Sequence, residues 1–436
     1  MRYFKFLLIL IFCSATATAQ TDSVYTLQQC IDIAIKNNLD VRQSELQMER
    51  RRIYYQQARE NLLPTLSGNA NHSINSGRSQ TADLTYVNRQ VFNGSYSLGS
   101  DVTVFNGLAL INSIKQTSLD YQAGKLDYQQ AKNNISLNVI TTYLQVMNSQ
   151  DQYTQSQNQL AVSQKTLERR EILNKDGNVQ PQDLYDLRGE TAGSKINLVT
   201  SRSAIYSSKL DLFQIMNVPF DKEIALVRLT ADELPGNYDL TASQVYNAAI
   251  SQFAQIQAAD LRVKSAEKGL AATKGYLYPS LGFNAGISTQ YSSGSAGSYD
   301  NQIRNNYGTG VGLGLRIPIL SNFRQRNQVS LAKIDLQNAR YTSEATKVSL
   351  KQQIEKAHVQ MTMAYERYQI TAEQVAAFSE SFRIADVKFN EGVLNSVDFL
   401  NAKVNMDRAK INLINARYDY FIRTKILDYY QGKMSF

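Results

Sequence analysis

The sequence is short of the residues on which most enzyme active sites depend. Its 436 residues contain two cysteines, two histidines (His72 and His358), six prolines and no tryptophan. Metal centres and nucleophile–base pairs use histidine and cysteine heavily, so this scarcity argues against both. The sequence also lacks a glycine-rich phosphate loop, a nucleophile elbow and any metal-ligand spacing. We therefore expect a protein that is not an enzyme and that needs no cofactor or metal.

The first 19 residues are typical of a secretory signal peptide. Arg2 and Lys5 precede an apolar run at 6–12, and small residues precede a cleavage site after Ala19. The alternative, a lipoprotein signal, fits less well because Cys13 lies inside the apolar run. The signal predicts export from the cytoplasm.

The mature chain has neither a large net charge nor an apolar segment long enough to form a membrane-spanning helix. Loss of Arg2 and Lys5 lowers the formal net charge from +8 to +6 (8 − 2), a mild bias that gives no reason to expect nucleic acid as a partner. Beyond residue 19, no run of about 18 apolar residues occurs. An exported chain of this kind is either soluble outside the cytoplasm or crosses an outer membrane as strands.

The mature sequence is an internal duplication with an offset of 215 residues. Residues that begin or end structural elements coincide at this offset: Thr26 with Thr241, Pro64 with Pro279, Gly177 with Gly392, and Asp183 with Asp398. We therefore predict a first repeat at 20–216 and a second at 241–436. The linker between them, at 217–240, contains prolines and a glycine that favour irregular structure.

Two intervals without proline, 105–173 and 320–389, are free to be helical throughout. An interval of about 65 helical residues measures ~100 Å. In the second interval, mainly apolar residues alternate spacings of four and three, which is typical of a coiled-coil seam. The seam consists of Leu350, Ile354, Ala357, Met361, Ala364, Tyr368, Thr371, Val375, Phe378, Phe382, Ala385 and Phe389. With returning helices, the sequence predicts long hairpins at 105–216 and 320–432.

Four segments alternate apolar residues with small or polar ones, as strands do. They lie at 66–75, 96–104, 281–291 and 307–317. Each has about ten residues, the length of a tilted strand that crosses a bilayer. The segments between paired strands, 76–95 and 292–306, are rich in glycine, serine and asparagine, so we expect loops there.

Four strands are too few to close a membrane barrel, which needs about eight. An open edge in lipid leaves backbone groups unpaired, so a barrel built from this chain requires two or three copies. The alternation alone also allows a soluble β-sandwich with one face in water. The export signal, the similar strand lengths and the small polar residues on one face favour the membrane barrel.

The last hairpin carries family motifs. The segments Phe389-Asn390-Glu391-Gly392, 397–402 and 415–420 resemble the final helical hairpin of TolC-family outer membrane efflux proteins. The resemblance extends over the mature chain through the duplication. It implies a mainly helical fold with membrane strands: a TolC-like trimeric channel with four barrel strands per chain and long coiled-coil helical hairpins. It also implies a homotrimer in the outer membrane, in contact with its lipid, with helices extending into the periplasm.

The resemblance further implies a function and partners. The chain would be the exit duct of a tripartite efflux pump and would pass small molecules out of the periplasm. Its partners would be a periplasmic adaptor (membrane fusion) protein and an inner-membrane transporter. One alternative is the exit duct of a type I protein secretion system. Another, of a different class, is a periplasmic coiled-coil structural or adhesion protein, which would explain the seams but not the strands.

The resemblance also places a candidate periplasmic aperture at the hairpin tips. Asp398 falls on the acidic pore position of the family, and Asn401 stands where some members carry a second aspartate. Asp183 and Asp186 hold the equivalent places in the first repeat. Such carboxylates would attract cations.

Simpler structural roles remain open for these tip residues. Asp183 and Asp398 fall in the first turn of a predicted helix, where a carboxylate complements the helix dipole. Gly177 and Gly392 are candidate turn residues, and the resemblance makes them candidates for adaptor docking.

Overall fold

The structure, a computed structural model, describes residues 24–80, 83–175, 180–221, 224–228 and 238–433. The predicted signal peptide and Gly177 lie outside the described residues. The chain divides into two compact units. Unit 1 comprises Met1–Ser44, Gln129–Phe253 and Ser349–Phe436, and unit 2 comprises Glu45–Tyr128 and Ala254–Val348.

The helices confirm the duplication, because their bounds recur at the predicted offset. Each pair of equivalent helices begins 215 residues apart. The pairs are α2 (Leu27–Asn37) with α6 (Ala242–Gln252), α3 (Leu39–Glu60) with α7 (Ala254–Gly275), α4 (Ala109–Lys175) with α9 (Arg324–Asn390), and α5 (Pro181–Met216) with α10 (Ser396–Tyr430). Thr26 and Thr241 begin α2 and α6 with the same capping box, in which Gln29 and Gln244 supply the reciprocal hydrogen bonds.

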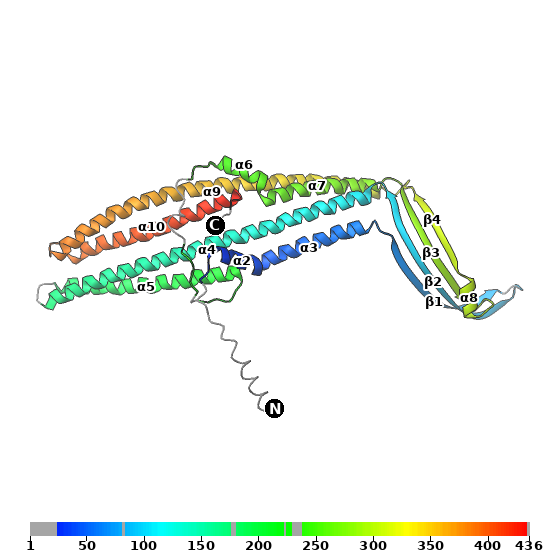
Figure 1. The fold of residues 1–436 in the computed structure, drawn as a ribbon, viewed down its shortest axis with the longest axis horizontal. Coiled ribbons are helices and arrows are strands. Elements are labelled where there is room, and N and C mark those ends of the chain that lie inside the picture. Colours follow the sequence, from blue (N-terminus) through cyan, green and yellow to red (C-terminus); the bar gives the residue numbers. More distant parts are fainter. Residues whose placement is uncertain (1–23, 81–82, 176–179, 222–223, 229–237, 434–436) are drawn as a thin grey trace, which may run out of the picture. The chain divides into compact units, whose positions relative to one another are not determined.

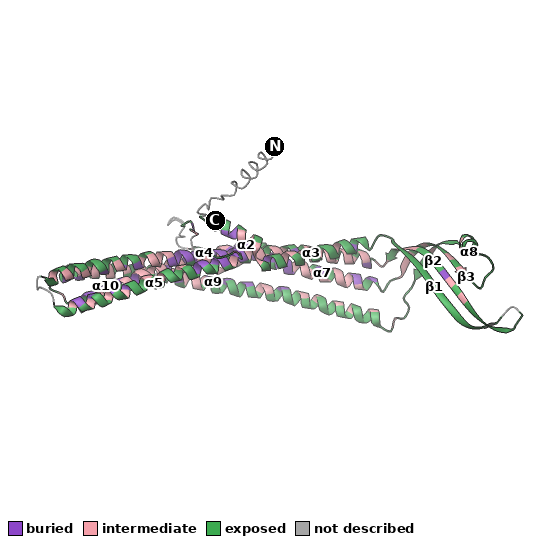
Figure 2. Ribbon diagram, turned by 90° about the horizontal axis from the view of Figure 1, so that it is seen from below, coloured by how far each residue is buried: buried purple, intermediate pink, exposed green. Residues whose placement is uncertain are grey.

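In unit 1 the long helices form two antiparallel hairpins, α4 with α5 and α9 with α10 (Figure 1). The predicted seam of α9 is buried: Leu350, Ile354, Met361, Ala364 and Phe389 are at most 3% exposed. Figure 2 shows the buried residues gathered most densely along α4. The coiled-coil period in the sequence therefore identified the packed face of α9 correctly.

Part of the predicted linker is attached to α4 in unit 1. Leu226 forms an isolated parallel bridge with Tyr25. The fully buried Tyr143 of α4 donates its hydroxyl hydrogen to the carbonyl of Val227 at 2.5 Å. A buried hydroxyl requires such a partner, so this contact fixes the described part of the linker against the helix.

Unit 2 contains one antiparallel sheet of four strands in chain order. The strands are β1 (Thr65–Gln80), β2 (Tyr86–Asn106), β3 (Ser280–Ser292) and β4 (Gly308–Arg316). The predicted loop at 76–95 is wrong, because β1 and β2 remain paired as far as Gln80 and Tyr86. Its serine, asparagine and glycine residues are weak strand formers, but cross-strand pairing overrides that preference. The other predicted loop, 292–306, contains the short helix α8 (Tyr299–Asn305).

The register gives the sheet one apolar and one polar face. Leu98 lies opposite Gly68 and Ile287, and Phe283 lies opposite Leu313, so these side chains share a face. Large apolar side chains on this face are exposed in the chain: Leu66, Ile74, Leu98, Phe283, Ile287, Val311, Leu313 and Leu315. The other face carries residues such as Asn69, Ser97 and Ser288.

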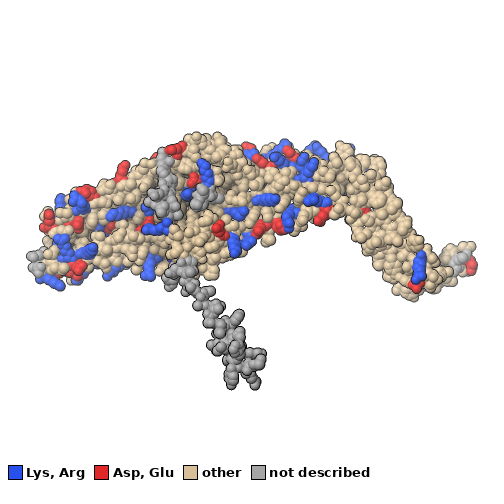
Figure 3. Space-filling model, viewed as in Figure 1, with Lys and Arg blue, Asp and Glu red and all other residues tan. Residues whose placement is uncertain are grey.

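Charge is scarce on the sheet. Arg78, Arg89, Asp101 and Arg316 are the charged residues of the four strands. Figure 3 shows the visible side of the strands almost free of charged atoms, whereas the helices carry many. In the described part of the chain, no helix has both the length and the hydrophobicity to cross a membrane.

Candidate functional site at the hairpin turns

The turn between α9 and α10 depends on Gly392. Its φ of +77° lies in the left-handed region that favours glycine. The amide of Gly392 donates to the carbonyl of Phe389 at 3.1 Å, and the amide of Val393 donates to that of Lys388 at 2.9 Å. These bonds satisfy carbonyls at the end of α9, as expected for a glycine just beyond a helix. Gly392 therefore lies in the turn that ends α9.

Asp398 has a structural role in the first turn of α10. Asn395 caps the helix, since its side-chain oxygen accepts a hydrogen bond from the Asp398 amide at 2.8 Å. The Asn395 side chain also donates to the Asp398 carboxylate at 2.9 Å. The carboxylate nevertheless remains exposed to solvent. Asp398 thus has the helix-terminal role considered from the sequence and is still available for a second role.

The first turn of α5 is built differently. Gln180 makes no side-chain capping bond, and Pro181 occupies the first helical position. Proline suits this place because its missing N–H would have no partner within the helix. Asp183 follows in the same turn, where its negative charge complements the helix dipole.

An aromatic cluster lies directly behind the α9–α10 turn. Phe389 and Phe399 stack with ring centroids 4.3 Å apart, and both are fully buried. Leu187 of α5 completes this buried cluster. Partly buried apolar side chains surround it: Leu167, Phe382, Leu394 and Leu400. Residues from both hairpins therefore share one small core.

Arg170 of α4 covers this core, although no sequence pattern predicted a role for it. It is 8% exposed, and its guanidinium lies over the Phe389 ring, 3.7 Å from the centroid. It donates to the Phe389 carbonyl at the end of α9. Burial lowers the pKa of Arg170, and the Asp183 carboxylate opposes that effect. The duplication could not reveal this residue, because Ala385 stands at the equivalent position of the second repeat.

The structure connects one of the four candidate aperture residues, Asp186, directly to the other hairpin. Asp186 accepts a hydrogen bond from the buried Ser396 at 2.8 Å, which joins α5 to the start of α10. Asp183 acts electrostatically on Arg170. Asn401 is exposed on α10. The set therefore lies within the first two turns of α5 and α10, two helices that pack together.

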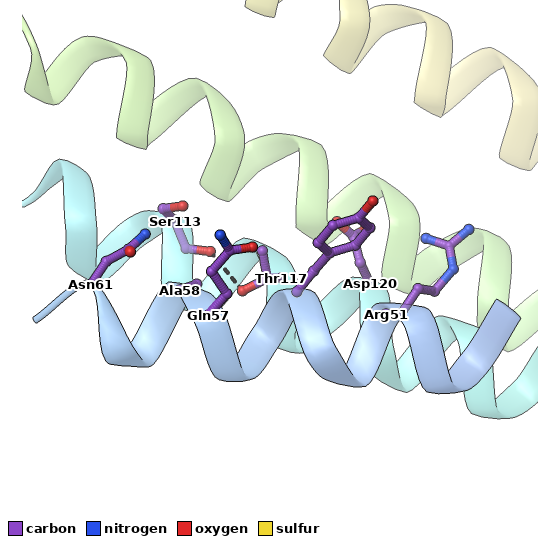
Figure 4. A pocket seen from close by; sticks show the side chains of 8 residues that line it. Arg51, Gln57, Ala58, Asn61, Ser113, Thr117 and Asp120 are labelled. Atoms are coloured by element: carbon purple, nitrogen blue, oxygen red, sulfur yellow. Dashed lines mark hydrogen bonds between the residues drawn. The ribbon is translucent and has the colours of Figure 1, made fainter. Parts of the chain in front are cut away.

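A concave surface lies in unit 2, between α3 and α4. Figure 4 shows side chains from both helices lining a cavity of about 280 Å³. They are Arg51, Tyr54, Gln57, Ala58 and Asn61 of α3, and Ser113, Thr117 and Asp120 of α4. Within the described residues, no cluster of three or more His, Cys, Asp or Glu side chains could hold a metal ion. The cavity is a space between neighbouring helices lined by mixed polar groups.

Comparison with protein families gives an extensive match. The family model described as outer membrane efflux protein matches residues 30–218 and 245–430, which are most of the chain. The outer membrane efflux protein BepC of Brucella suis biovar 1 (strain 1330) is 24% identical over 212 residues, 48% of this chain. That match spans 44% of the length of BepC.

Solved structures share the fold over nearly the whole chain. CusC, a protein described as forming a transmembrane channel, has a TM-score of 0.80 at 15% identity, with 93% of this chain and 91% of CusC covered. The open state of the Neisseria gonorrhoeae MtrE outer membrane channel has a TM-score of 0.76 at 19% identity, with 93% and 88% covered. The predicted TolC-like fold class is therefore confirmed.

Proposed function

Because the chain belongs to the outer membrane efflux protein family, we propose that it forms the exit duct of a tripartite efflux pump and lets small molecules leave the periplasm passively. Membership of this family puts the chain in the outer membrane, as the sequence predicted. As a duct, the chain catalyses no reaction. The energy for transport would come from an inner-membrane transporter.

The exposed apolar face of the sheet carries this proposal. Leu66, Val311 and Leu313 are each at least 70% exposed in the single chain, and water would disfavour so continuous an apolar surface. Among the described residues, the outer strands β1 and β4 each pair with a neighbouring strand on one side only. Three copies would join these edges into one barrel of twelve strands (three times four), which leaves no backbone unpaired in lipid. This geometry supports a homotrimer with its apolar face against outer membrane lipid.

The hairpin turns would form the periplasmic aperture of this duct. Asp183, Asp186 and Asp398 would give a trimer nine carboxylates (three times three), with Asn401 beside them. Rings of carboxylates attract cations into a pore. Asp398 can serve both as a helix-terminal residue and as a pore residue, because its carboxylate is exposed as well as hydrogen-bonded.

The turn at Gly392 would also dock the periplasmic adaptor. Val393 and Val397 flank the start of α10 and are 74% and 51% exposed. Exposed apolar side chains at the turn of a long hairpin favour contact with another protein. Gly177 would contribute to the same surface on the first hairpin.

Release of trapped solutes tests the duct. Liposomes containing the purified protein should lose a small encapsulated dye without ATP or a proton gradient, whereas protein-free liposomes should retain it. Retention of the dye in liposomes that contain correctly inserted trimers would overturn the proposal.

Ion selectivity tests the aperture separately. The double variant Asp183→Asn and Asp398→Asn removes two charges per chain at constant side-chain size. It should move the reversal potential in a salt gradient towards zero, because cation preference is lost. Asp211→Asn, on the exposed side of α5, is the matched control. Equal reversal potentials for all three proteins would leave Asp183 and Asp398 with helix-terminal roles only.

A further inference from the structure

The connection from β4 to α9 exposes apolar side chains to solvent. It comprises residues 317–323, which we call the junction segment, and it joins the end of the sheet to the start of α9 (Figure 1). Ile319 is 92% exposed and Leu320 is 78% exposed in the chain. Water disfavours adjacent apolar side chains that are exposed to this extent, so the junction segment should contact an apolar environment.

The backbone of the junction segment ends in a turn that occurs in both repeats. Asn322 and Phe323 have φ of +49° and +58°. Gly107 and Leu108, which stand 215 residues earlier and precede α4, have φ of +64° and +63°. A left-handed backbone is costly for Phe323 and Leu108, which carry large side chains, so the surrounding fold maintains this turn. The exposed apolar residues of the junction segment are therefore part of a defined structure.

The two repeats differ in the residues that follow this turn. Arg324 and Arg326 lie in the first turn of α9. Ala109 and Ile111 occupy the equivalent positions in α4. The basic pair therefore belongs to the second repeat alone, beside the junction segment. A positive charge at the start of a helix opposes the helix dipole, so helix stability does not explain these two arginines.

Arg326 lies beside the junction segment and has no acidic partner. Its guanidinium lies over the Phe323 ring, 5.8 Å from the ring centroid. Within the described part of the chain, no carboxylate forms an ion pair with it. The sequence from 301 to 334 contains five basic residues and no aspartate or glutamate. An arginine next to exposed apolar side chains fits the boundary of a bilayer, where the guanidinium binds lipid phosphate and the apolar side chains reach the acyl chains.

The junction segment extends the apolar face of the sheet. Leu313 and Leu315 lie on that face in β4 and are exposed in the chain. Ile317 and Ile319 continue the same alternation in the sequence beyond the end of the strand. Under the proposed function this face lies against lipid, so the junction segment lies at the periplasmic edge of the same apolar surface.

A second connection lies at the same level of the sheet. Ser280, the first residue of β3, pairs with Arg316, the last residue of β4. Tyr276 and Tyr278, which precede β3, are 50% and 62% exposed. Tyrosine is enriched at membrane–water interfaces, because its ring is apolar and its hydroxyl is polar. Both connections therefore have the composition of an interfacial region.

We propose that the junction segment enters the periplasmic leaflet of the outer membrane and that Arg326 binds the phosphate of an anionic phospholipid there. This inference rests on the proposed function. The excess of basic residues around the segment favours a headgroup with a net negative charge. The contact fixes the depth of the barrel, because the guanidinium stays with the headgroups while Ile319 and Leu320 stay with the acyl chains.

Tryptophan fluorescence reads the depth of the junction segment, because the chain has no tryptophan of its own. In liposomes, Ile319→Trp should be quenched most strongly by phospholipids brominated close to the headgroup. Leu313→Trp, six residues further into the sheet, should be quenched most strongly by phospholipids brominated deep in the acyl chains. Tyr341→Trp, at an exposed position of α9, is the control and should not be quenched.

These variants separate the junction segment from the proposed function. Quenching of Leu313→Trp without quenching of Ile319→Trp would overturn lipid binding by the segment, a result expected if a neighbouring copy covers it. Quenching of Ile319→Trp without quenching of Leu313→Trp would refute the membrane barrel and would still support lipid binding by the segment. Absence of quenching at both positions would refute both proposals.

A brominated anionic lipid tests the role of Arg326. In liposomes of phosphatidylcholine with a minor fraction of brominated phosphatidylglycerol, Ile319→Trp should be quenched more than that fraction alone explains. Arg326→Gln in this background should lower the preference for the anionic lipid about fivefold, as expected for one arginine near a charged bilayer surface. Arg324→Gln is the matched control and should keep the preference, because residues two positions apart point to different sides of a helix. An unchanged preference in Arg326→Gln, or an equal loss in both variants, would overturn the site.

Discussion

Gly107 and Gly275 approach each other so closely that neither has room for a side chain. A Cβ built on Gly107 would lie 2.2 Å from the carbonyl oxygen of Gly275, and one on Gly275 would lie 2.8 Å from the carbonyl oxygen of Gly107. Gly107 follows β2 directly, and Gly275 is the last residue of α7. The connection from β2 to α4 and the connection from α7 to β3 therefore contact each other through backbone atoms in unit 2.

This contact predicts a strong effect of small substitutions. Gly107→Ala should lower the free energy of unfolding by about 2 kcal/mol or more, because the methyl group would meet backbone atoms and the φ of +64° disfavours any side chain. The measurement is the thermal midpoint of helix loss followed by circular dichroism. Gly189→Ala is the control, since it lies inside α5 with nothing within 4 Å of its added Cβ. Equal midpoints for the two variants would contradict the close packing.

Arg170 offers a test of the core behind the hairpin turns. Arg170→Met should lower the free energy of unfolding by about 2 kcal/mol, through loss of its charged hydrogen bond to the Phe389 carbonyl and of its contact with the ring. Arg169→Met removes the same charge from an exposed neighbour and should change stability little. Chemical denaturation of both variants in detergent measures the difference. A smaller loss for Arg170→Met than for Arg169→Met would exclude the proposed packing.

Cys30 should be unreactive in the folded protein. It is fully buried, and burial raises the pKa of its thiol from 9.0 to about 12. At pH 8 the thiolate fraction is then about a thousandfold lower than for a free thiol, so alkylation by iodoacetamide should be slow until the chain unfolds. Between pH 9 and 12 only the unfolded state would lose this proton, so its contribution to stability should fall as the pH rises. Rapid alkylation at pH 8 under native conditions would disprove the burial.

The sequence predicted those parts of the fold that depend on local periodicity. The seam from Leu350 to Phe389 appeared as spacings of four and three. The structure buries the seam residues towards both ends, whereas those from Tyr368 to Phe382 are half-buried. Thr26 and Thr241 appeared as a duplicated pair and both cap helices. These features could be predicted because the interacting residues lie within a few positions of one another or repeat at one fixed offset.

Contacts between distant segments were not predictable in this way. The extension of β1 to Gln80 depends on pairing with β2 and is hidden by serine, asparagine and glycine residues that suggest a loop. Arg170 acts on a carbonyl 219 residues further along the chain. Lys403 did leave a local signal, a charge at an apolar position of the heptad, but its partner Glu190 is 213 residues away. The heptad pattern could therefore mark Lys403 as unusual but could not identify its partner.

Single-channel recording on the purified protein tests the central claim most directly. We expect the protein to insert into planar bilayers as a homotrimer and to conduct ions in discrete, cation-selective steps, because three four-stranded sheets would enclose one pore lined by carboxylates at its periplasmic end. Detergent-solubilised protein that is folded and monomeric, and that produces no steps in the bilayer, would contradict it.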